Sequence, residues 1–186
     1  RYEKYQRDFV WLTNAGVALK TDLVAEPKSP LLKTANPMKF KLYQSDTGML
    51  MARYPITLSQ AAYLDEKDPN LGGIYENAVA QQLAAQGRAL FYYQTRKRGE
   101  IDFMVEAGNG KAVPIEVKSG RYYHAHASLD HVLETEGYGA DLGIVLSRGN
   151  VERRGKVLYL PLYAIPFLPL LLDAPLPEGF KLRIRK

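Results

Sequence analysis

Residues 99–120 read GEIDFMVEAGNGKAVPIEVKSG, and this stretch decides the fold of the chain. Apolar and polar residues alternate in EIDFMVE and again in PIEVK, which is the two-residue period of β-strands. The Asn-Gly pair at residues 109 and 110 separates the two runs and is typical of a tight hairpin turn. We therefore expect an antiparallel β-hairpin with its acidic residues on one face and its apolar residues on the other.

The expected register of this hairpin brings two carboxylates together. If Glu106 pairs with Ala112, Asp102 lies opposite Glu116. Like charges directly opposite each other destabilise a sheet, so this pair favours a positive charge between them. Mg²⁺ (or Mn²⁺) takes carboxylate ligands and completes its coordination with water and phosphate oxygens. We therefore interpret Asp102 and Glu116 as candidate metal ligands.

Two further residues complete a candidate reaction centre. Lys118 shares a strand face with Glu116, and the same register places it opposite Glu100. A lysine there is able to orient a water molecule or to neutralise charge that develops on a phosphate. Glu76 lies at the edge of the apolar stripe of a helix expected over residues 74–86. The alternative for Glu76 is an ordinary carboxylate that caps a neighbouring backbone group.

The order of elements along the chain predicts an α/β protein with a mixed sheet. The polar segment near residues 65–73 indicates a boundary. It divides the chain into a helical, wing-like segment over residues 1–66, a main domain over 67–172 and a tail over 173–186. We expect helices at residues 2–15, from Asp46, from Thr57 or Ser59, at 74–86 and at 125–136, and strands at 17–24, 40–43, 90–95, 100–106, 114–118, 140–147 and 156–163.

The composition narrows the class of protein. The chain has 186 residues, of which 46% are hydrophobic, and this is enough to bury a core. It has no cysteine, which excludes disulfides and cysteine-type zinc sites and favours the cytoplasm. The longest apolar run, residues 158–172, contains three prolines and is too short for a membrane span. Residue 1 is arginine, so we expect the sequence to be part of a longer polypeptide.

Basic residues flank the acidic hairpin, and the formal net charge of +5 favours polyanionic partners. Arg96, Lys97 and Arg98 precede the acidic strand, and Ser119 and Arg121 follow the lysine strand. We interpret these five residues as candidate contacts to a DNA backbone. The alternative is a solvated loop, with Ser119 capping the end of a strand.

Two other groups of residues carry weaker signals. Three histidines at positions 124, 126 and 131 lack the spacing of a zinc-binding helix, so we expect them to lie on the surface. A second basic group is expected in a hairpin loop at the far end of the sheet, with DNA contact as one interpretation and a solvated loop as the other; it consists of Arg148, Arg153, Arg154 and Lys156.

Several stretches together resemble known nucleases. The glutamate of GGIYENAVAQQL (72–83), the aspartate of YYQTRKRGEIDF (92–103) and the Glu-x-Lys of IEVKSG (115–120) resemble the PD-(D/E)XK nuclease superfamily of restriction endonucleases and Holliday-junction resolvases. With KFKLYQSDTGML (39–50) and YLPLY (159–163), the chain is similar to an uncharacterised C-terminal domain. That domain follows AAA-type ATPase modules in bacterial and archaeal ATP-binding proteins.

This resemblance implies a fold and an activity. The fold would be a restriction-endonuclease-like α-β-β-β-α-β core that follows a winged-helix remnant. Asp102, Glu116 and Glu76 would be metal ligands and Lys118 the catalytic lysine in Mg²⁺-dependent hydrolysis of duplex or branched DNA. The departure is Ile101, which stands where the superfamily pattern has proline.

The resemblance leaves the activity open. One alternative is a catalytically inactive module of the same fold that binds DNA or a protein partner for the ATPase, and another is a protein–protein adaptor. The ATPase module itself would precede residue 1, because the sequence contains no phosphate-binding loop of the GxxxxGK type.

Overall fold

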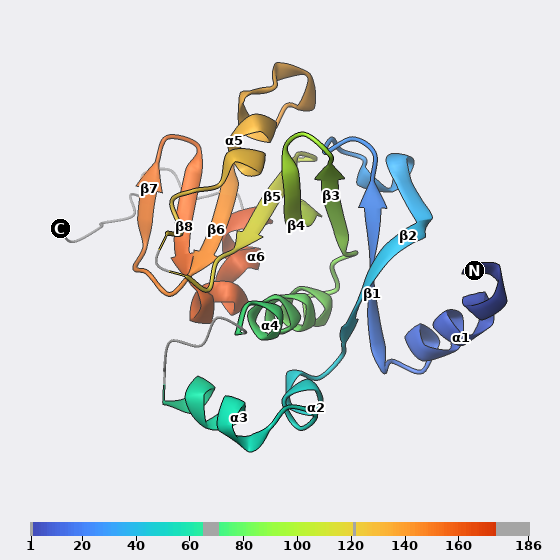
Figure 1. Cartoon of the computed structure of the whole chain (residues 1–186). Coiled ribbons are helices and arrows are strands. Elements are labelled where there is room, and N and C mark those ends of the chain that lie inside the picture. The colour runs from blue at the N-terminus through green and yellow to red at the C-terminus, as the bar shows by residue number, and fades with distance from the viewer. Residues whose placement is uncertain (1, 65–70, 121, 174–186) are drawn as a thin grey trace.

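One eight-stranded mixed sheet organises the molecule, with strand order β2-β1-β3-β4-β5-β6-β8-β7 (Figure 1). The computed structural model describes residues 2–64, 71–120 and 122–173. The α/β class expected from the sequence is confirmed. The strands are β1 (Ala18–Val24), β2 (Ala35–Gln44), β3 (Phe91–Thr95), β4 (Gly99–Glu106), β5 (Ala112–Val117), β6 (Gly143–Ser147), β7 (Glu152–Arg154) and β8 (Val157–Pro161).

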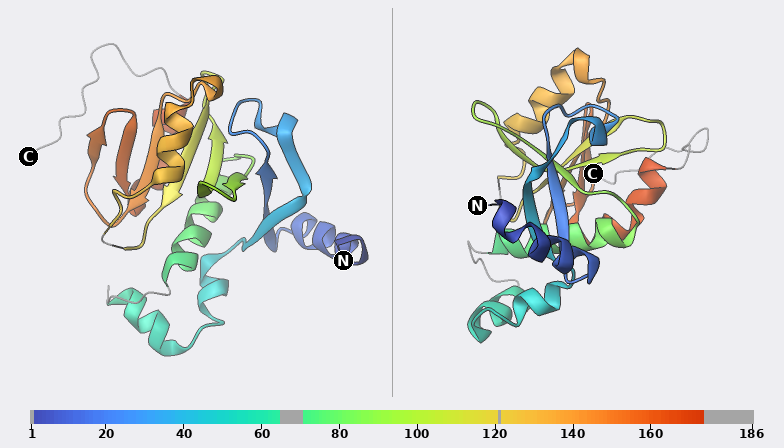
Figure 2. Two further views of the ribbon diagram at one scale, coloured as in Figure 1. Left: turned by 45° about the horizontal axis from the view of Figure 1, so that its top comes forward. Right: turned by 90° about the vertical axis from the view of Figure 1, so that its right-hand side faces the viewer.

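Helices cover both faces of this sheet. They are α1 (Tyr2–Asn14), α2 (Thr47–Met51), α3 (Ile56–Tyr63), α4 (Gly72–Ala85), α5 (Ala127–Glu134) and α6 (Leu168–Leu172), with 3₁₀ turns η1 (Leu31–Thr34), η3 (Glu136–Tyr138) and η4 (Leu162–Phe167). One core cluster joins α4, η4 and α6 to the sheet, and a second joins α5 to the opposite face. Figure 2 (left) shows α5 running across the front of the strands. Strands covered on both sides read as apolar runs, and all five residues of β6 are buried accordingly.

The β4–β5 hairpin has the expected register, with Glu106 paired to Ala112. The expectation of one apolar and one acidic face is wrong. Ile101 and Met104 are buried under α5, whereas Phe103 and Val105 are buried under α4. The reason is a β-bulge against β3, where the ladder shifts register and interrupts the two-residue alternation. Covering both faces of the sheet also leaves no solvated side for the hairpin.

The N-terminal ribbon belongs to the main sheet. The antiparallel pair β1 and β2 was expected as a wing, but β1 also pairs in parallel with β3. The sheet is therefore continuous across the boundary expected at residues 66 and 67, which itself lies among the residues not described. Tyr43 of β2 joins the core under α4, where its ring centroid lies 5.5 Å from that of Phe103.

Local signals for the shorter elements agree with the structure. Asp46 caps α2 by accepting a hydrogen bond of 2.8 Å from the backbone N–H of Met49. The proline-containing run after residue 158 packs against the core through β8, η4 and α6. Of the tail expected over 173–186, only Asp173 lies within the described residues. Within the described ranges, no helix has the length and apolar character needed to cross a bilayer.

Candidate functional site

Asp102 lies where β4 and β5 separate. The ladder between the two strands ends at the pair Phe103–Ile115. Beyond it, Asp102 Oδ2 accepts a hydrogen bond of 2.7 Å from the backbone N–H of Val117. A side-chain carboxylate thus takes the place of a backbone acceptor, and this fixes Asp102 at the carboxyl end of β5.

The surroundings of Asp102 disfavour its charge. Burial, together with the carboxylates of Glu76 and Glu116, raises its pKa from 3.8 to about 7. The hydrogen bond from Val117 and the ammonium group of Lys41 act in the opposite direction, but they do not compensate. Asp102 therefore titrates near neutral pH, and any additional positive charge beside it would favour its ionised form.

Glu116 and Lys118 form an ion pair on β5. Lys118 Nζ lies 2.5 Å from Glu116 Oε1. The other carboxylate oxygen, Glu116 Oε2, has no hydrogen-bond partner. It is also shielded from water, because the residue is only 6% exposed. A buried acceptor without a partner is costly and requires an explanation. Glu116 is aligned with Val145 of β6, which places its side chain on the face that α5 covers.

Glu76 approaches Asp102 from α4, on the other face of the sheet. Its Oε2 accepts a hydrogen bond of 3.2 Å from Tyr43 Oη and lies 4.0 Å from Lys41 Nζ. Lys41 also forms an ion pair with Glu100. The expected pairing of Glu100 with Lys118 is therefore not observed, because each of these residues has a nearer partner of opposite charge.

Lys41 and Tyr43 belong to the site but were not predicted from the sequence. Their alternation with Leu42 shows that they share a strand face. That alternation could have predicted that Lys41 and Tyr43 lie on the same face. It could not have predicted that they approach Glu76. The approach depends on the β1–β2 ribbon extending the sheet beside α4, which is a long-range feature. Burial and the neighbouring acids Glu76, Asp102 and Glu100 raise the pKa of Tyr43 above its ordinary value, so its hydroxyl stays protonated and donates.

We call these seven residues the carboxylate cluster: Lys41, Tyr43, Glu76, Glu100, Asp102, Glu116 and Lys118. Among the described residues, no group of three or more histidine, cysteine, aspartate or glutamate side chains is arranged to hold a metal ion. The geometry explains this, because Glu76 and Glu116 approach Asp102 from different faces. Two carboxylates are nevertheless sufficient for Mg²⁺ when water fills its other positions. The unpartnered Oε2 of Glu116 and the raised pKa of Asp102 fit such an ion.

The expected DNA contacts lie around the same end of the hairpin. Arg96, Lys97 and Arg98 form the exposed turn between β3 and β4, and Glu100 is the second residue of β4 after that turn. Ser119 follows Lys118 directly, and its hydroxyl lies near Gly72 at the start of α4. Arg121 lies outside the described residues. The β4–β5 register thus brings the three basic turn residues and Ser119 to one end of the sheet.

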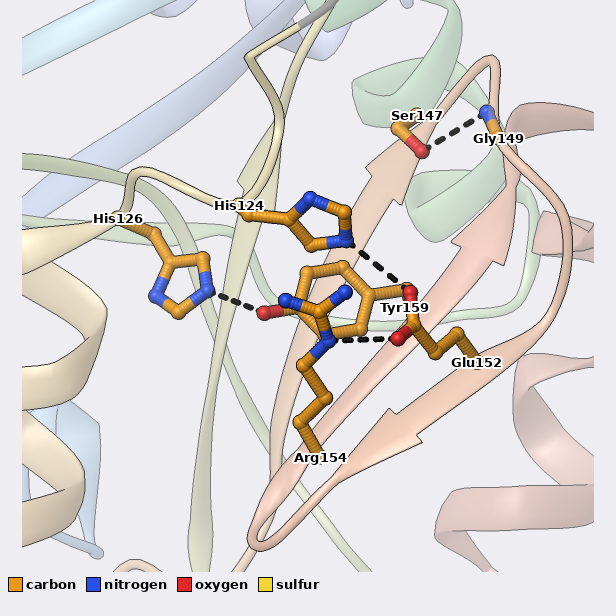
Figure 3. Close-up of polar contacts among 7 residues, drawn as sticks. All are labelled: His124, His126, Ser147, Gly149, Glu152, Arg154 and Tyr159. Atoms are coloured by element: carbon orange, nitrogen blue, oxygen red, sulfur yellow. Dashed lines mark hydrogen bonds and ion pairs between the residues drawn. The ribbon is translucent and has the colours of Figure 1, made fainter.

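A second polar cluster lies between α5 and the β7–β8 edge (Figure 3). We call it the histidine–tyrosine cluster; it consists of His124, His126, Glu152, Arg154 and Tyr159. The expectation that all the histidines lie on the surface is wrong for His126, which is buried. Its Nε2 lies 2.6 Å from Tyr159 Oη.

The exposed part of this cluster centres on Glu152. Glu152 lies 3.0 Å from His124 Nε2 and accepts a hydrogen bond of 2.6 Å from Arg154 Nε. These two contacts lower the pKa of Glu152. Arg153, from the second basic group, lies beside it on the exposed edge strand β7, and Lys156 Nζ donates to the backbone oxygen of Leu133 at 2.9 Å.

The fold and the site define a class: a mixed α/β domain with a carboxylate–lysine cluster at one end of a hairpin in its sheet. The family model described as "Domain of unknown function (DUF4143)" matches residues 71–165, and the chain belongs to this family. The match spans α4 to η4 and includes Glu76, Asp102, Glu116 and Lys118. Comparisons with curated proteins and with solved structures gave no match.

Proposed function

We propose that this domain hydrolyses DNA phosphodiester bonds with Mg²⁺ or Mn²⁺ held by Asp102 and Glu116. One observation carries the proposal: two neighbouring acids lack sufficient positive charge. Glu116 Oε2 is buried without a partner, and the pKa of Asp102 is raised by burial and by nearby carboxylates. A divalent cation would satisfy both groups.

The residues of the chain would divide the chemistry between them. When bound, the divalent ion would supply Lewis-acid activation of water and neutralise charge on the phosphate. Lys118, held by Glu116 at 2.5 Å, would place an ammonium group beside the attacked phosphate. Glu76 and Tyr43 would hold the acidic side of the cluster in place, and direct metal binding by Glu76 stays a prediction.

The element order supports the nuclease proposal. From α4 to β6 the chain runs α-β-β-β-α-β, as expected for a restriction-endonuclease-like core, with the candidate acids on the first helix and the second and third strands. Membership of the PD-(D/E)XK superfamily is part of the proposal. So is an AAA-type ATPase module that precedes this domain in the same polypeptide and controls access to DNA.

A cleavage assay tests the proposal. Duplex, single-stranded and branched DNA are incubated with the protein and Mg²⁺ or Mn²⁺. We expect Asp102→Asn and Lys118→Ala each to reduce cleavage by about 100-fold or more, since either change removes a group that acts on the developing charge. Glu152→Gln is the matched control, because it alters an acid of the histidine–tyrosine cluster. Cleavage that persists in both site variants would contradict the assignment.

A second candidate function is a catalytically inactive module that binds DNA or a protein partner for the ATPase. The position of Lys41 favours it, because a lysine that pairs with Glu100 and lies 4.0 Å from Glu76 already supplies positive charge to the acids. Calorimetric titration separates the two functions. Binding of Mn²⁺ that disappears in Glu116→Gln supports the enzyme, whereas absent metal binding together with absent cleavage supports the module.

A further inference from the structure

A groove of about 910 Å³ runs between α1 and the strands β2 and β3. Its lining includes the aromatic residues Tyr5, Phe9, Phe40 and Tyr92. Figure 1 shows α1 beside β1 and β2 and well separated from α5 and α6. We call this feature the α1 groove. It contains none of the seven residues of the carboxylate cluster.

The charged residues that line the α1 groove are basic. Lys39 and Arg96 line it, and no lining residue that the structure describes is acidic. Both basic side chains are exposed, and neither forms a hydrogen bond or an ion pair with the described part of the chain. Two uncompensated cations beside aromatic rings match the backbone and the bases of a nucleic acid.

The aromatic residues favour a single strand over a duplex. Tyr5 is 48% exposed, and Phe9 and Phe40 contact each other edge to face at 5.1 Å. Bases within a duplex are already stacked on their neighbours, so aromatic side chains reach base faces mainly in unpaired segments. A basic groove with several rings is therefore better suited to a single strand.

The α1 groove and the carboxylate cluster are in contact through Tyr92, a groove residue that lies beside Lys41 of the cluster. The ring of Tyr92 lines the groove, and Lys41 Nζ lies 5.2 Å from its centroid. Lys41 in turn pairs with Glu100 of the cluster. Arg96 lines the groove and belongs to the turn that precedes Glu100. A strand in the groove would thus be led toward the candidate reaction centre.

We propose that the α1 groove binds an unpaired segment of nucleic acid, with a base against the exposed ring of Tyr5 and phosphates at Lys39 and Arg96. The substrate of the domain is therefore DNA with a single-stranded part, such as a flap, a tail or the open arm of a branch. This substrate class rests on the proposed nuclease function. Binding of a single strand in the groove does not.

The test measures binding without catalysis. Fluorescence anisotropy is recorded in EDTA with a labelled oligothymidylate of about 12 nucleotides and with a blunt duplex of the same length. We expect tighter binding of the single strand. Tyr5→Ala should weaken that binding by about tenfold, which is typical for the loss of one stacked base. Lys39→Ala combined with Arg96→Ala should reduce the slope of log affinity against log salt by about 1.4.

Two variants serve as matched controls. Trp11→Ala removes a 67% exposed aromatic residue of the same helix that does not line the α1 groove. Lys28→Ala removes an exposed cation of the β1–β2 connection. Both should bind the single strand as the unaltered protein does. Circular dichroism verifies that the groove variants retain their fold.

The outcomes separate the two proposals. Duplex binding as tight as single-strand binding, full affinity in the groove variants, or an equal loss in Trp11→Ala would each overturn the assignment of the groove. Self-association that Tyr5→Ala abolishes, without any oligothymidylate binding, would assign the groove to a second copy and overturn it as well. Groove-dependent binding without any Mg²⁺- or Mn²⁺-dependent cleavage would overturn the nuclease proposal alone.

Discussion

The carboxylate cluster and the histidine–tyrosine cluster lie on the same sheet and differ in how well their charges are paired. In the histidine–tyrosine cluster, Glu152 contacts His124 and Arg154 within 3.0 Å, and the buried His126 meets Tyr159 Oη at 2.6 Å through Nε2 and lies 3.0 Å from Asp130 Oδ1 through Nδ1, which makes no hydrogen bond. In the carboxylate cluster, Glu116 Oε2 has no partner, and burial and neighbouring acids raise the pKa of Asp102 to about 7.

This difference teaches where to look for function. A buried carboxylate oxygen without a partner beside a carboxyl group with a raised pKa is found more often at functional sites than elsewhere in a fold. We therefore interpret the histidine–tyrosine cluster as a structural contact between α5 and β8. We interpret the carboxylate cluster as a site that requires a bound cation. Four experiments test this contrast, from the largest expected effect to the smallest.

The largest effect concerns the pH dependence of divalent-ion binding. Bound cations require ionised carboxylates, so the proton on Asp102 must leave first. We expect the Mg²⁺ or Mn²⁺ affinity to rise roughly 100-fold between about pH 5 and about pH 7 and then to level off, since each pH unit below the pKa costs about a factor of ten. Calorimetric titration across this range measures it. A flat profile in the unaltered protein would contradict the role of Asp102.

The second effect is stabilisation by Asp102→Asn. Because the pKa of Asp102 is raised in the folded state, the folded protein keeps a proton that the unfolded chain releases above about pH 4. Stability should therefore fall between about pH 4 and about pH 7 and stay low above that range.

Asparagine has no proton to lose and can still accept the hydrogen bond from Val117. We expect Asp102→Asn to be more stable than the unaltered protein by about 1–3 kcal/mol at pH 8. This is less than the free energy that corresponds to the full pKa shift of Asp102, because the residue is only partly buried. At pH 4 the two proteins should be nearly equally stable. Urea denaturation at both pH values measures this. Destabilisation at pH 8 would mean that the charge of Asp102 is already well compensated.

The third effect is destabilisation by Tyr159→Phe. The change removes the hydroxyl that meets His126 Nε2 at 2.6 Å and leaves a buried nitrogen without that partner. We expect a loss of about 1–3 kcal/mol in the free energy of unfolding, with no change in divalent-ion affinity. Tyr163→Phe is the control, because this residue is 78% exposed. A change in ion affinity with Tyr159→Phe would link the two clusters.

The smallest effect belongs to Glu152→Ala. The Glu152 carboxylate and Arg154 lie at the surface, where water and salt screen an ion pair. We expect a change of less than about 0.5 kcal/mol in the free energy of unfolding, at low and at high salt alike. Thermal denaturation in two salt concentrations measures it. A loss as large as that expected for Tyr159→Phe would show that the exposed part of the cluster also holds β7 to the molecule.

The hairpin that positions Asp102, Glu116 and Lys118 could be predicted from local sequence. Alternation, the Asn-Gly turn and the parity of Glu116 and Lys118 are short-range signals, and the register they predict for the hairpin is confirmed. The start of α2 followed from Asp46 and the ends of α1 and α4 from Gly16 and Gly87, whereas α5 ends at Glu134, before the expected stop at Gly137. These features depend on a few neighbouring residues, so a single sequence is sufficient to read them.

The remainder depends on contacts between distant segments. The bulge in β4 appears only against β3, so the separation of Ile101 and Phe103 onto different faces could not be predicted from local alternation. Lys41 and Tyr43 reach Glu76 only because the ribbon joins the sheet. His126 looked like a surface residue because its partner Tyr159 lies 33 positions away. Long-range pairing therefore limits how much of this site a single sequence can predict.

The parallel pairing of β1 with β3 has a practical consequence for dissecting this molecule. A fragment that begins at residue 67 would keep the four acids of the cluster but would turn β3 into a bare edge, open to pairing with other chains. It would also remove Tyr43 from the core under α4, and no residue of the fragment would fill the space that Tyr43 occupies. The sheet, and not the polar linker, therefore defines the smallest unit that can be expected to fold and act on its own.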